Sequence, residues 1–214
     1  MITLAPIDLA LIAGYFLAVL LIGFLSRSKS EAGDFLLAGR SLTLPLFVMT
    51  LVSTWYGGIL GVGEFSYLYG ISNWVVQGVP YYIFAVVFAL LLAKRIRASN
   101  LVTIPDKLHA AYDLRTAVLG SFLTFILMTP APYVLMLAVL LQLVTGWSLL
   151  ACVLIGTGAT TIYLFFGGFR ADVNTDVFEF ILMFLGFAVI LPFAYEKFGG
   201  IEFIRAHVPP LHLT

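Results

Sequence analysis

The sequence has 214 residues, of which 62% are hydrophobic and only 10% are charged. A soluble domain carries about 25% charged residues, so this composition predicts an integral membrane protein. The formal net charge is zero, which gives no electrostatic basis for binding nucleic acid. The single cysteine, Cys152, excludes a disulfide within the chain, and the sequence has no zinc-type ligand spacing and no phosphate-binding glycine loop. We therefore expect a membrane protein that is not an enzyme and needs no cofactor.

The first predicted span covers residues 7–25, which are almost wholly apolar. Asp8 stands near its start, and two cations, Arg27 and Lys29, follow its end. A secretory signal would carry its positive charge in front and a small-residue cleavage site behind, so we expect a retained helix whose N-terminus lies outside. The polar, glycine-containing segment 27–41 predicts a loop.

The stretch 43–70 is long enough to cross a bilayer, but its middle reads Ser53-Thr54-Trp55-Tyr56-Gly57-Gly58. Two adjacent glycines each weaken a helix by roughly 1 kcal/mol relative to alanine. Backbone groups freed within hydrocarbon cost several kcal/mol unless protein, water or a ligand satisfies them. The stretch therefore indicates either a break that lines a cavity or a place where small residues allow close helix packing, and the residues leave both open.

Four further apolar stretches predict spans at residues 75–93, 116–143, 149–166 and 177–195. Between the first two, the polar segment 98–115 contains Thr103 and Asp106, which predict a capped helix start. That helix could lie at the membrane interface or be an ordinary loop helix. Pro130 and Pro132 predict a kink in the middle of the span that contains them.

If the chain crosses the membrane six times and begins outside, every lysine and arginine except Lys197 and Arg205 lies on the inner side. This distribution follows the positive-inside rule. We expect the N-terminus and a mixed-charge tail of residues 196–214 to lie outside. The expected location is the inner (plasma) membrane of a bacterium.

Acidic side chains in or beside the spans are candidates for function, because a carboxylate inside a bilayer costs about 2.5–3.5 kcal/mol on insertion scales. Glu64, in the outer half of the broken span, could gate or bind a cation, or hydrogen-bond a nearby tyrosine. Asp176 and Glu179 are three residues apart and share a helix face at the start of the last span. Asp176 could act on a cation or simply cap that helix, and the residues leave the two readings open.

Several segments together resemble a known family: Gly39-Arg40-Ser41-Leu42 before the broken span, Thr103-Ile104-Pro105-Asp106, and Gly167-Gly168-Phe169 followed by Asn174-Thr175-Asp176. Their order resembles that in sodium/solute symporters, the group of sodium/glucose, sodium/proline and pantothenate carriers, from residue 7 to about 200. The resemblance implies an all-α membrane fold with a leading helix and two inverted repeats of five helices, as in LeuT-like transporters. The leading helix would be 7–25 and the first repeat 43–195, within a single membrane domain 1–214.

The resemblance also implies a binding site at the break, with Na⁺ as the coupling ion. Unwound backbone carbonyls and half-helix ends suit sodium and a solute at such a break. The family's contacts fall on residues around the break and on the last span: Leu51, Thr54 and Asp176 for sodium, and Trp55, Tyr56, Gly57 and Gly58 for the solute.

The sequence departs from the family pattern at Asn174, where tryptophan is usual, and at Glu179, where glutamine is common. The glycine pair replaces polar residues that touch the substrate in sugar carriers, so the solute stays open. No segment corresponds to the second repeat. We expect the N-terminal half of a sodium-coupled symporter of a small organic solute, with the second-repeat helices supplied by the missing part of the chain or by a partner. The alternatives are a membrane sensor module of a symporter-like signalling protein and a nonfunctional fragment.

Overall fold

The computed structural model describes residues 4–26, 32–56, 58–209 and 212–213, and every regular element in these ranges is a helix. The chain divides into two compact units. The first contains Met1–Gly61 and Pro132–His207, and the second contains Val62–Ala131 and Val208–Thr214. The predicted all-α class is confirmed.

Long apolar helices make up most of the described chain. Four of them are long and apolar enough to cross a membrane: Pro6–Leu25, Trp74–Ala98, Leu114–Thr145 and Leu149–Phe198. A bent pair of helices, Gly33–Arg40 with Leu44–Tyr56, could provide a fifth span. Many leucine, isoleucine and phenylalanine side chains on these helices are exposed, as expected of surfaces that face lipid. The chain is therefore an integral membrane protein.

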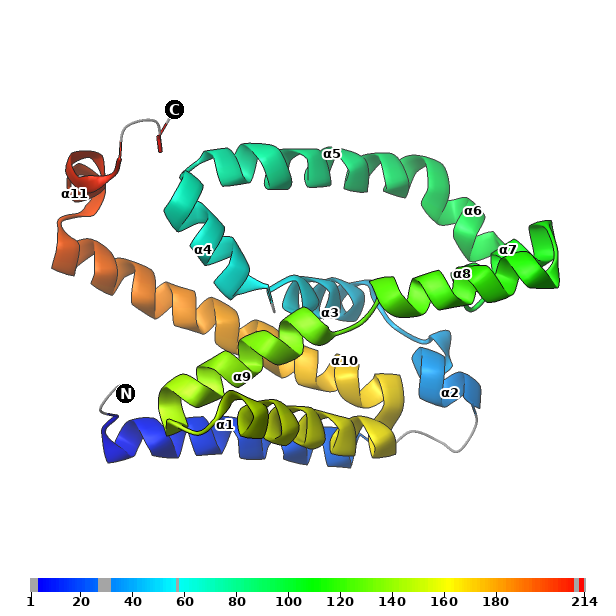
Figure 1. Ribbon diagram of the computed structural model, residues 1–214, viewed down its shortest axis with the longest axis horizontal. Coiled ribbons are helices and arrows are strands. Elements are labelled where there is room, and N and C mark those ends of the chain that lie inside the picture. Colours follow the sequence, from blue (N-terminus) through cyan, green and yellow to red (C-terminus); the bar gives the residue numbers. More distant parts are fainter. Residues whose placement is uncertain (1–3, 27–31, 57, 210–211, 214) are drawn as a thin grey trace. The chain divides into compact units, whose positions relative to one another are not determined.

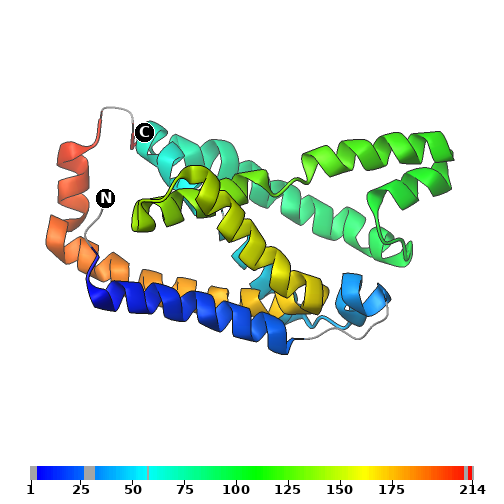
Figure 2. The ribbon, with the colours of Figure 1, turned by 60° about the horizontal axis from the view of Figure 1, so that its bottom comes forward.

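In the first unit, the helix α10 (Leu149–Phe198) is the element on which the others pack. The helices α1 (Pro6–Leu25) and α3 (Leu44–Tyr56) both contact it, and α1 runs alongside it in two views (Figures 1 and 2). α1 confirms a helix over the predicted first span 7–25. A short helix, α2 (Ala32–Leu37), also packs on α10 and corrects the prediction of a plain loop. Residues 27–31 of that predicted loop lie outside the described residues.

A small apolar cluster joins α1 to α10. Its buried members are Val19, Tyr163 and Ala171, and Tyr15 and Phe178 pack against them. The rings of Tyr15 and Phe178 stack with centroids 6.3 Å apart. These contacts fix the side of α1 that carries Tyr15 against α10.

The backbone of α10 changes direction at Gly168. Its φ of 58° and ψ of −153° lie outside the helical region and in a region that is essentially restricted to glycine. A Cβ at this position would lie 2.6 Å from the carbonyl oxygen of Phe35 in α2. Next to this glycine, Arg170 forms an ion pair with Asp34 of α2, with an N···O distance of 2.7 Å. Sterics and charge thus both hold α2 at this point of α10.

The predicted spans 149–166 and 177–195 both fall within α10, on either side of Gly168. A straight helix of 50 residues would be about 75 Å long, more than twice the thickness of a bilayer core. Two helical parts of α10 meet across a kink at Gly168, so each predicted span corresponds to one of these parts. A further helix, α11 (Gly200–His207), lies within the predicted mixed-charge tail 196–214.

Two of the predicted breaks are confirmed. α3 ends at Tyr56 and α4 (Ile59–Tyr69) begins three residues later, while Gly57 itself lies outside the described residues. The span that contains the two prolines consists of α8 (Leu114–Leu127) and α9 (Ala131–Thr145), with a non-helical link between them.

The second unit contains most of α4, a continuous helix Trp74–Ala98 that includes α5 (Val79–Val87) and α6 (Ala93–Ala98), and then α7 (Ile104–Ala111) and α8. α7 folds back on α8, as Figure 1 shows. The capped start of α7 is confirmed, because the Asp106 N–H donates to Thr103 Oγ1 at 3.2 Å and the Thr103 N–H donates to Asp106 Oδ2 at 2.8 Å.

Candidate functional site

The two residues predicted to offer sodium carbonyls, Leu51 and Thr54, lie in the second half of α3. Because α3 ends at Tyr56, the carbonyls of its last four residues cannot bond further along the helix. Thr54 belongs to this group, whereas Leu51 lies one turn earlier, inside the hydrogen-bonded part. The Thr54 hydroxyl donates to the carbonyl of Thr50 at 2.9 Å, so the side chain is engaged within α3.

The residues predicted to touch the solute follow directly. Trp55 is 47% exposed, whereas Tyr56 is half-buried and its ring meets that of Phe187 in α10 edge to face, with centroids 5.5 Å apart. The Gly58 N–H donates to the carbonyl of Trp55 at 3.2 Å. Gly57 lies outside the described residues. Of the predicted solute contacts, Tyr56 therefore contacts α10 through its ring.

Three carboxylates recur on one face of α10. Asp172, Asp176 and Glu179 are separated by four and three residues, the spacing that places side chains one above another on a helix. The Tyr15 hydroxyl donates to Glu179 Oε1 at 2.9 Å, and the Ser53 hydroxyl donates to Glu179 Oε2 at 3.4 Å. Glu179 thus joins α10 to both α1 and α3.

Asp176 is buried, with 8% of its surface exposed. Thr50 and Ser53 of α3 lie beside it. Within the described residues, Asp176 Oδ2 and Thr50 Oγ1 are buried side-chain oxygens that form no hydrogen bond. Asp176 also lies in the interior of α10, where there are no terminal N–H groups to cap, so the capping alternative is wrong. A buried carboxylate oxygen without a hydrogen-bond donor is costly, which points to a cation, a proton or a ligand that satisfies it.

A cavity of about 420 Å³ opens beside Glu179, and all of its lining residues belong to the first unit. Its polar lining consists of Tyr15, Ser53, Tyr56 and Glu179. Its apolar lining comes from α4, α9 and α10: Ile59, Leu60, Met136, Leu137, Leu140, Leu182 and Met183. Among the described residues that were predicted to contact the solute, Tyr56 lines this cavity and Trp55 and Gly58 do not.

The sequence did not show that Tyr15, Ser53 and Glu179 belong to one site. The shared helix face of Asp176 and Glu179 was a usable signal, and so was a tyrosine within an otherwise apolar leading span. The pairing of α1 with α10 could not be read from the sequence, because nothing in the pattern of α1 specifies the helix on which it packs.

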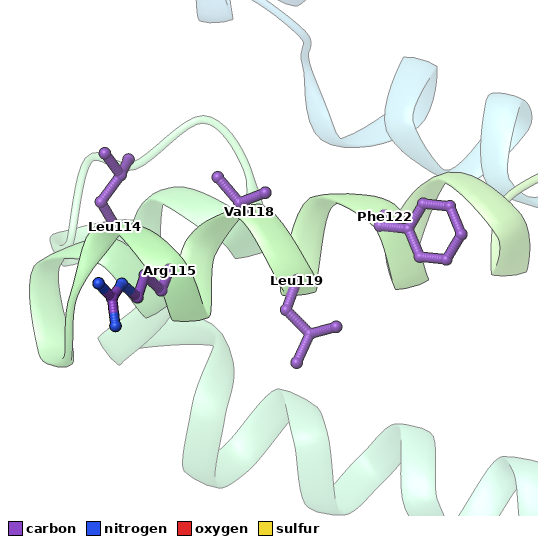
Figure 3. A pocket seen from close by; sticks show the side chains of 5 residues that line it. All are labelled: Leu114, Arg115, Val118, Leu119 and Phe122. Carbon is purple, nitrogen blue, oxygen red and sulfur yellow. The ribbon is translucent and has the colours of Figure 1, made fainter.

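Two other features lie in the second unit. Glu64 is exposed on α4, and its predicted gating role stays a prediction. A surface groove of about 540 Å³ follows α8 and is formed by Leu114, Arg115, Val118, Leu119 and Phe122 (Figure 3). Because all five residues come from one helix and Arg115 is the only charged one, this groove offers a solute little specific recognition.

Apolar helices long enough to span a membrane, an interrupted helix and a buried carboxylate beside it define an integral membrane protein with a candidate ion-binding site. The chain belongs to the Sodium:solute symporter family, whose match covers residues 35–208. The resemblance found in the sequence is therefore confirmed.

Individual relatives match most of the chain at low identity. The chain is 26% identical to mouse "Solute carrier family 5 member 4A" over 91% of this chain and 31% of the relative. It is 28% identical to rat "Sodium/glucose cotransporter 2", over 91% of this chain and 30% of the relative. It is also 28% identical to "High-affinity choline transporter 1" of Caenorhabditis elegans, over 89% of this chain and 36% of the relative. The chain thus spans about a third of the length of these relatives. No solved structure matches it.

Proposed function

We propose that this chain forms part of a carrier that moves a small organic solute across the membrane together with Na⁺. The observation that carries the proposal is the buried Asp176, whose Oδ2 makes no hydrogen bond within the described residues and which lies beside Thr50 on α3. A monovalent cation is a suitable partner for this oxygen, because it would neutralise the charge that burial makes costly. Membership of the Sodium:solute symporter family supports Na⁺ as that cation.

In this proposal, sodium binds between the end of α3 and the carboxylate face of α10. The carbonyls of Leu51 and Thr54 and the side chain of Asp176 are its proposed protein contacts. The position of Thr54 in the last turn of α3 supports a carbonyl that is available to an ion. For Leu51 to contribute in the same way, the last turn of α3 would have to unwind further.

The proposed solute contacts are Trp55, Tyr56, Gly57 and Gly58, which follow the sodium residues along the chain. The cavity supports the role of Tyr56, which lines it, because ligand pockets of this size are mostly apolar with a few polar groups. Glu64, further along α4, is the proposed gating residue. The relatives named for glucose and choline transport differ in their solutes, so they do not select one for this chain.

The proposed architecture is six spans in a LeuT-like arrangement, with a leading helix and the first of two inverted five-helix repeats in one membrane domain. Both ends of the chain would lie outside, at the inner membrane of a bacterium, as the positive-inside rule favours. The second repeat would come from a further part of the protein or from a partner. This proposal is supported by the fact that the chain matches only about a third of the length of each relative.

The proposal is tested with the complete carrier purified in detergent, by titrating NaCl against KCl and measuring the Tm. Sodium binding stabilises the folded state by RT ln(1 + [Na⁺]/Kd), so Na⁺ should raise the Tm above its value at equal KCl. Thr54→Ala should keep this difference because it retains the carbonyl, whereas Gly57→Leu should abolish it because bulk fills the site and favours a continuous helix. Equal Tm values in the two salts for the unmodified carrier would refute sodium coupling.

A further inference from the structure

The cavity beside Glu179 combines one carboxylate with two tyrosines. Tyr15, Ser53 and Tyr56 provide the other polar groups of its lining, and the rest of the lining is apolar. Glu179 is the one charged residue that lines the cavity within the described part of the chain. A solute that enters the cavity therefore meets a negative charge in apolar surroundings.

Within the described residues, no positive charge is paired with Glu179. Arg170, the cation that forms an ion pair elsewhere on α10, pairs with Asp34 of α2 and not with Glu179. The hydrogen bonds from Tyr15 and Ser53 hold the two carboxylate oxygens in place but bring no positive charge. A carboxylate has about four acceptor positions, so these two donors leave Glu179 able to bind a further group.

The dimensions and chemistry of the cavity favour an organic cation over a bare metal ion. A small metal cation needs several oxygen ligands close around it, whereas this lining offers few oxygens within about 420 Å³. A small ammonium group suits a carboxylate beside aromatic rings, because it gains both charge pairing and cation–π attraction. Its alkyl part would contact side chains such as Leu140 and Met183.

Building on the proposed transport function, we propose that Glu179 binds the positively charged group of the solute, so that the carrier takes small organic ammonium compounds. Tyr15 and Ser53 act as positioning residues, since each donates a hydrogen bond to one oxygen of the carboxylate. Tyr56 provides an aromatic surface at the end of α3. The charge of the solute would then be recognised on α10, one turn beyond Asp176.

The test measures ligand binding to the complete carrier by the rise in Tm, in saturating NaCl. The probes are tetramethylammonium and n-butylammonium, with tert-butanol and n-butanol as uncharged molecules of similar size. At least one ammonium compound should raise the Tm, and its uncharged counterpart should not at the same concentration. A carrier that binds neither ammonium compound, or binds the alcohols equally well, would overturn the proposal.

Variants assign the effect to Glu179. Glu179→Gln should weaken ammonium binding at least tenfold while the response to NaCl is kept. Glu196→Gln removes the same charge from an exposed position on α10 and should bind as the unmodified carrier does. If Glu179→Gln does not fold, Glu179→Asp keeps the charge but shortens the side chain and should still weaken binding measurably. If a folded Glu179 variant binds the ammonium compound as tightly as the unmodified carrier does, Glu179 does not bind the solute charge. If NaCl does not raise the Tm of the unmodified carrier, sodium coupling is refuted instead.

Discussion

The hydroxyl of Tyr15 lies 2.9 Å from Glu179 Oε1, which ties the leading helix to the carboxylate face of α10. Both residues are partly buried, and a hydrogen bond to a charged group contributes about 1.5–3 kcal/mol. Tyr15→Phe should therefore lower the free energy of unfolding by roughly that amount, because the carboxylate loses a donor while packing is kept. Tyr133→Phe, at a tyrosine that is 46% exposed, is the control and should have little effect. The readout is thermal unfolding in detergent, and equal Tm values for the two variants would contradict the buried hydrogen bond.

Gly168 should not tolerate a side chain. Its positive φ opposes alanine, and so does the carbonyl oxygen of Phe35, which would lie 2.6 Å from the added Cβ. We expect Gly168→Ala to destabilise the protein by about 1–3 kcal/mol. Gly186→Ala lies on the same helix with no atom within 4 Å of its Cβ, and should be neutral or stabilise by up to about 1 kcal/mol. Size-exclusion profiles after heating compare the two, and a Gly168→Ala protein as stable as Gly186→Ala would show that α10 is not interrupted there.

The cap of α7 makes a prediction about pH. Hydrogen bonds from the Thr103 side chain and backbone lower the pKa of Asp106 below its usual value of about 3.9. A carboxyl whose pKa is lower in the folded state adds stability above its unfolded pKa and loses it as the pH falls through the folded pKa. Asp106→Asn should therefore lower the Tm at pH 7, and the difference should vanish at pH values below the folded pKa.

The capping hydroxyl is tested with a matched pair of variants at pH 7. Thr103→Ser keeps the oxygen that accepts from the Asp106 N–H, and Thr103→Ala removes it. Circular dichroism during heating should show a lower Tm for Thr103→Ala than for Thr103→Ser. Identical melting curves would mean that the cap does not stabilise α7.

The proposed orientation is tested by cysteine labelling in intact cells. In a Cys152→Ala background, Asn100→Cys should resist a membrane-impermeant maleimide, because residue 100 would lie inside next to the basic cluster of α6. Thr214→Cys should react, since the C-terminal end would lie outside. Labelling of residue 100 from outside would overturn the six-span orientation.

Much of the fold could be predicted from the sequence because hydrophobic length and helix breakers act locally. The leading helix, the break beside Tyr56 and the cap at Thr103 all follow from neighbouring residues. The sequence around Gly168 also predicted the end of one span, and the structure agrees, because the backbone at Gly168 is not helical. What the sequence did not reveal is that the next helix begins directly after this glycine, whose backbone conformation turns the chain between the two helical parts of α10.

The candidate site could be predicted only in part. Asp176 and Tyr56 stood out because a buried carboxylate and a broken helix are unusual in a membrane protein. The sequence left open a capping role for Asp176, because its neighbours are natural caps. The structure excludes that role, because Asp176 lies inside a helix and not at its start. Tyr15 and Ser53 are far from Glu179 along the chain, so only tertiary packing brings them together.

The most direct test of sodium coupling is the sodium activation of Asp176→Asn in the complete carrier, with Glu196→Gln as the control for loss of one exposed charge. Asparagine keeps most of the shape of aspartate but removes the negative charge that would attract Na⁺. The measurement is sodium-dependent solute uptake into proteoliposomes. Asp176→Asn should need at least about tenfold more Na⁺ for half-maximal uptake, or turn over at least about tenfold more slowly, and a factor of ten corresponds to about 1.4 kcal/mol in either case. Glu196→Gln should retain the activation curve of the unmodified carrier. An unchanged activation curve and rate for Asp176→Asn would contradict a role for this carboxylate in sodium coupling.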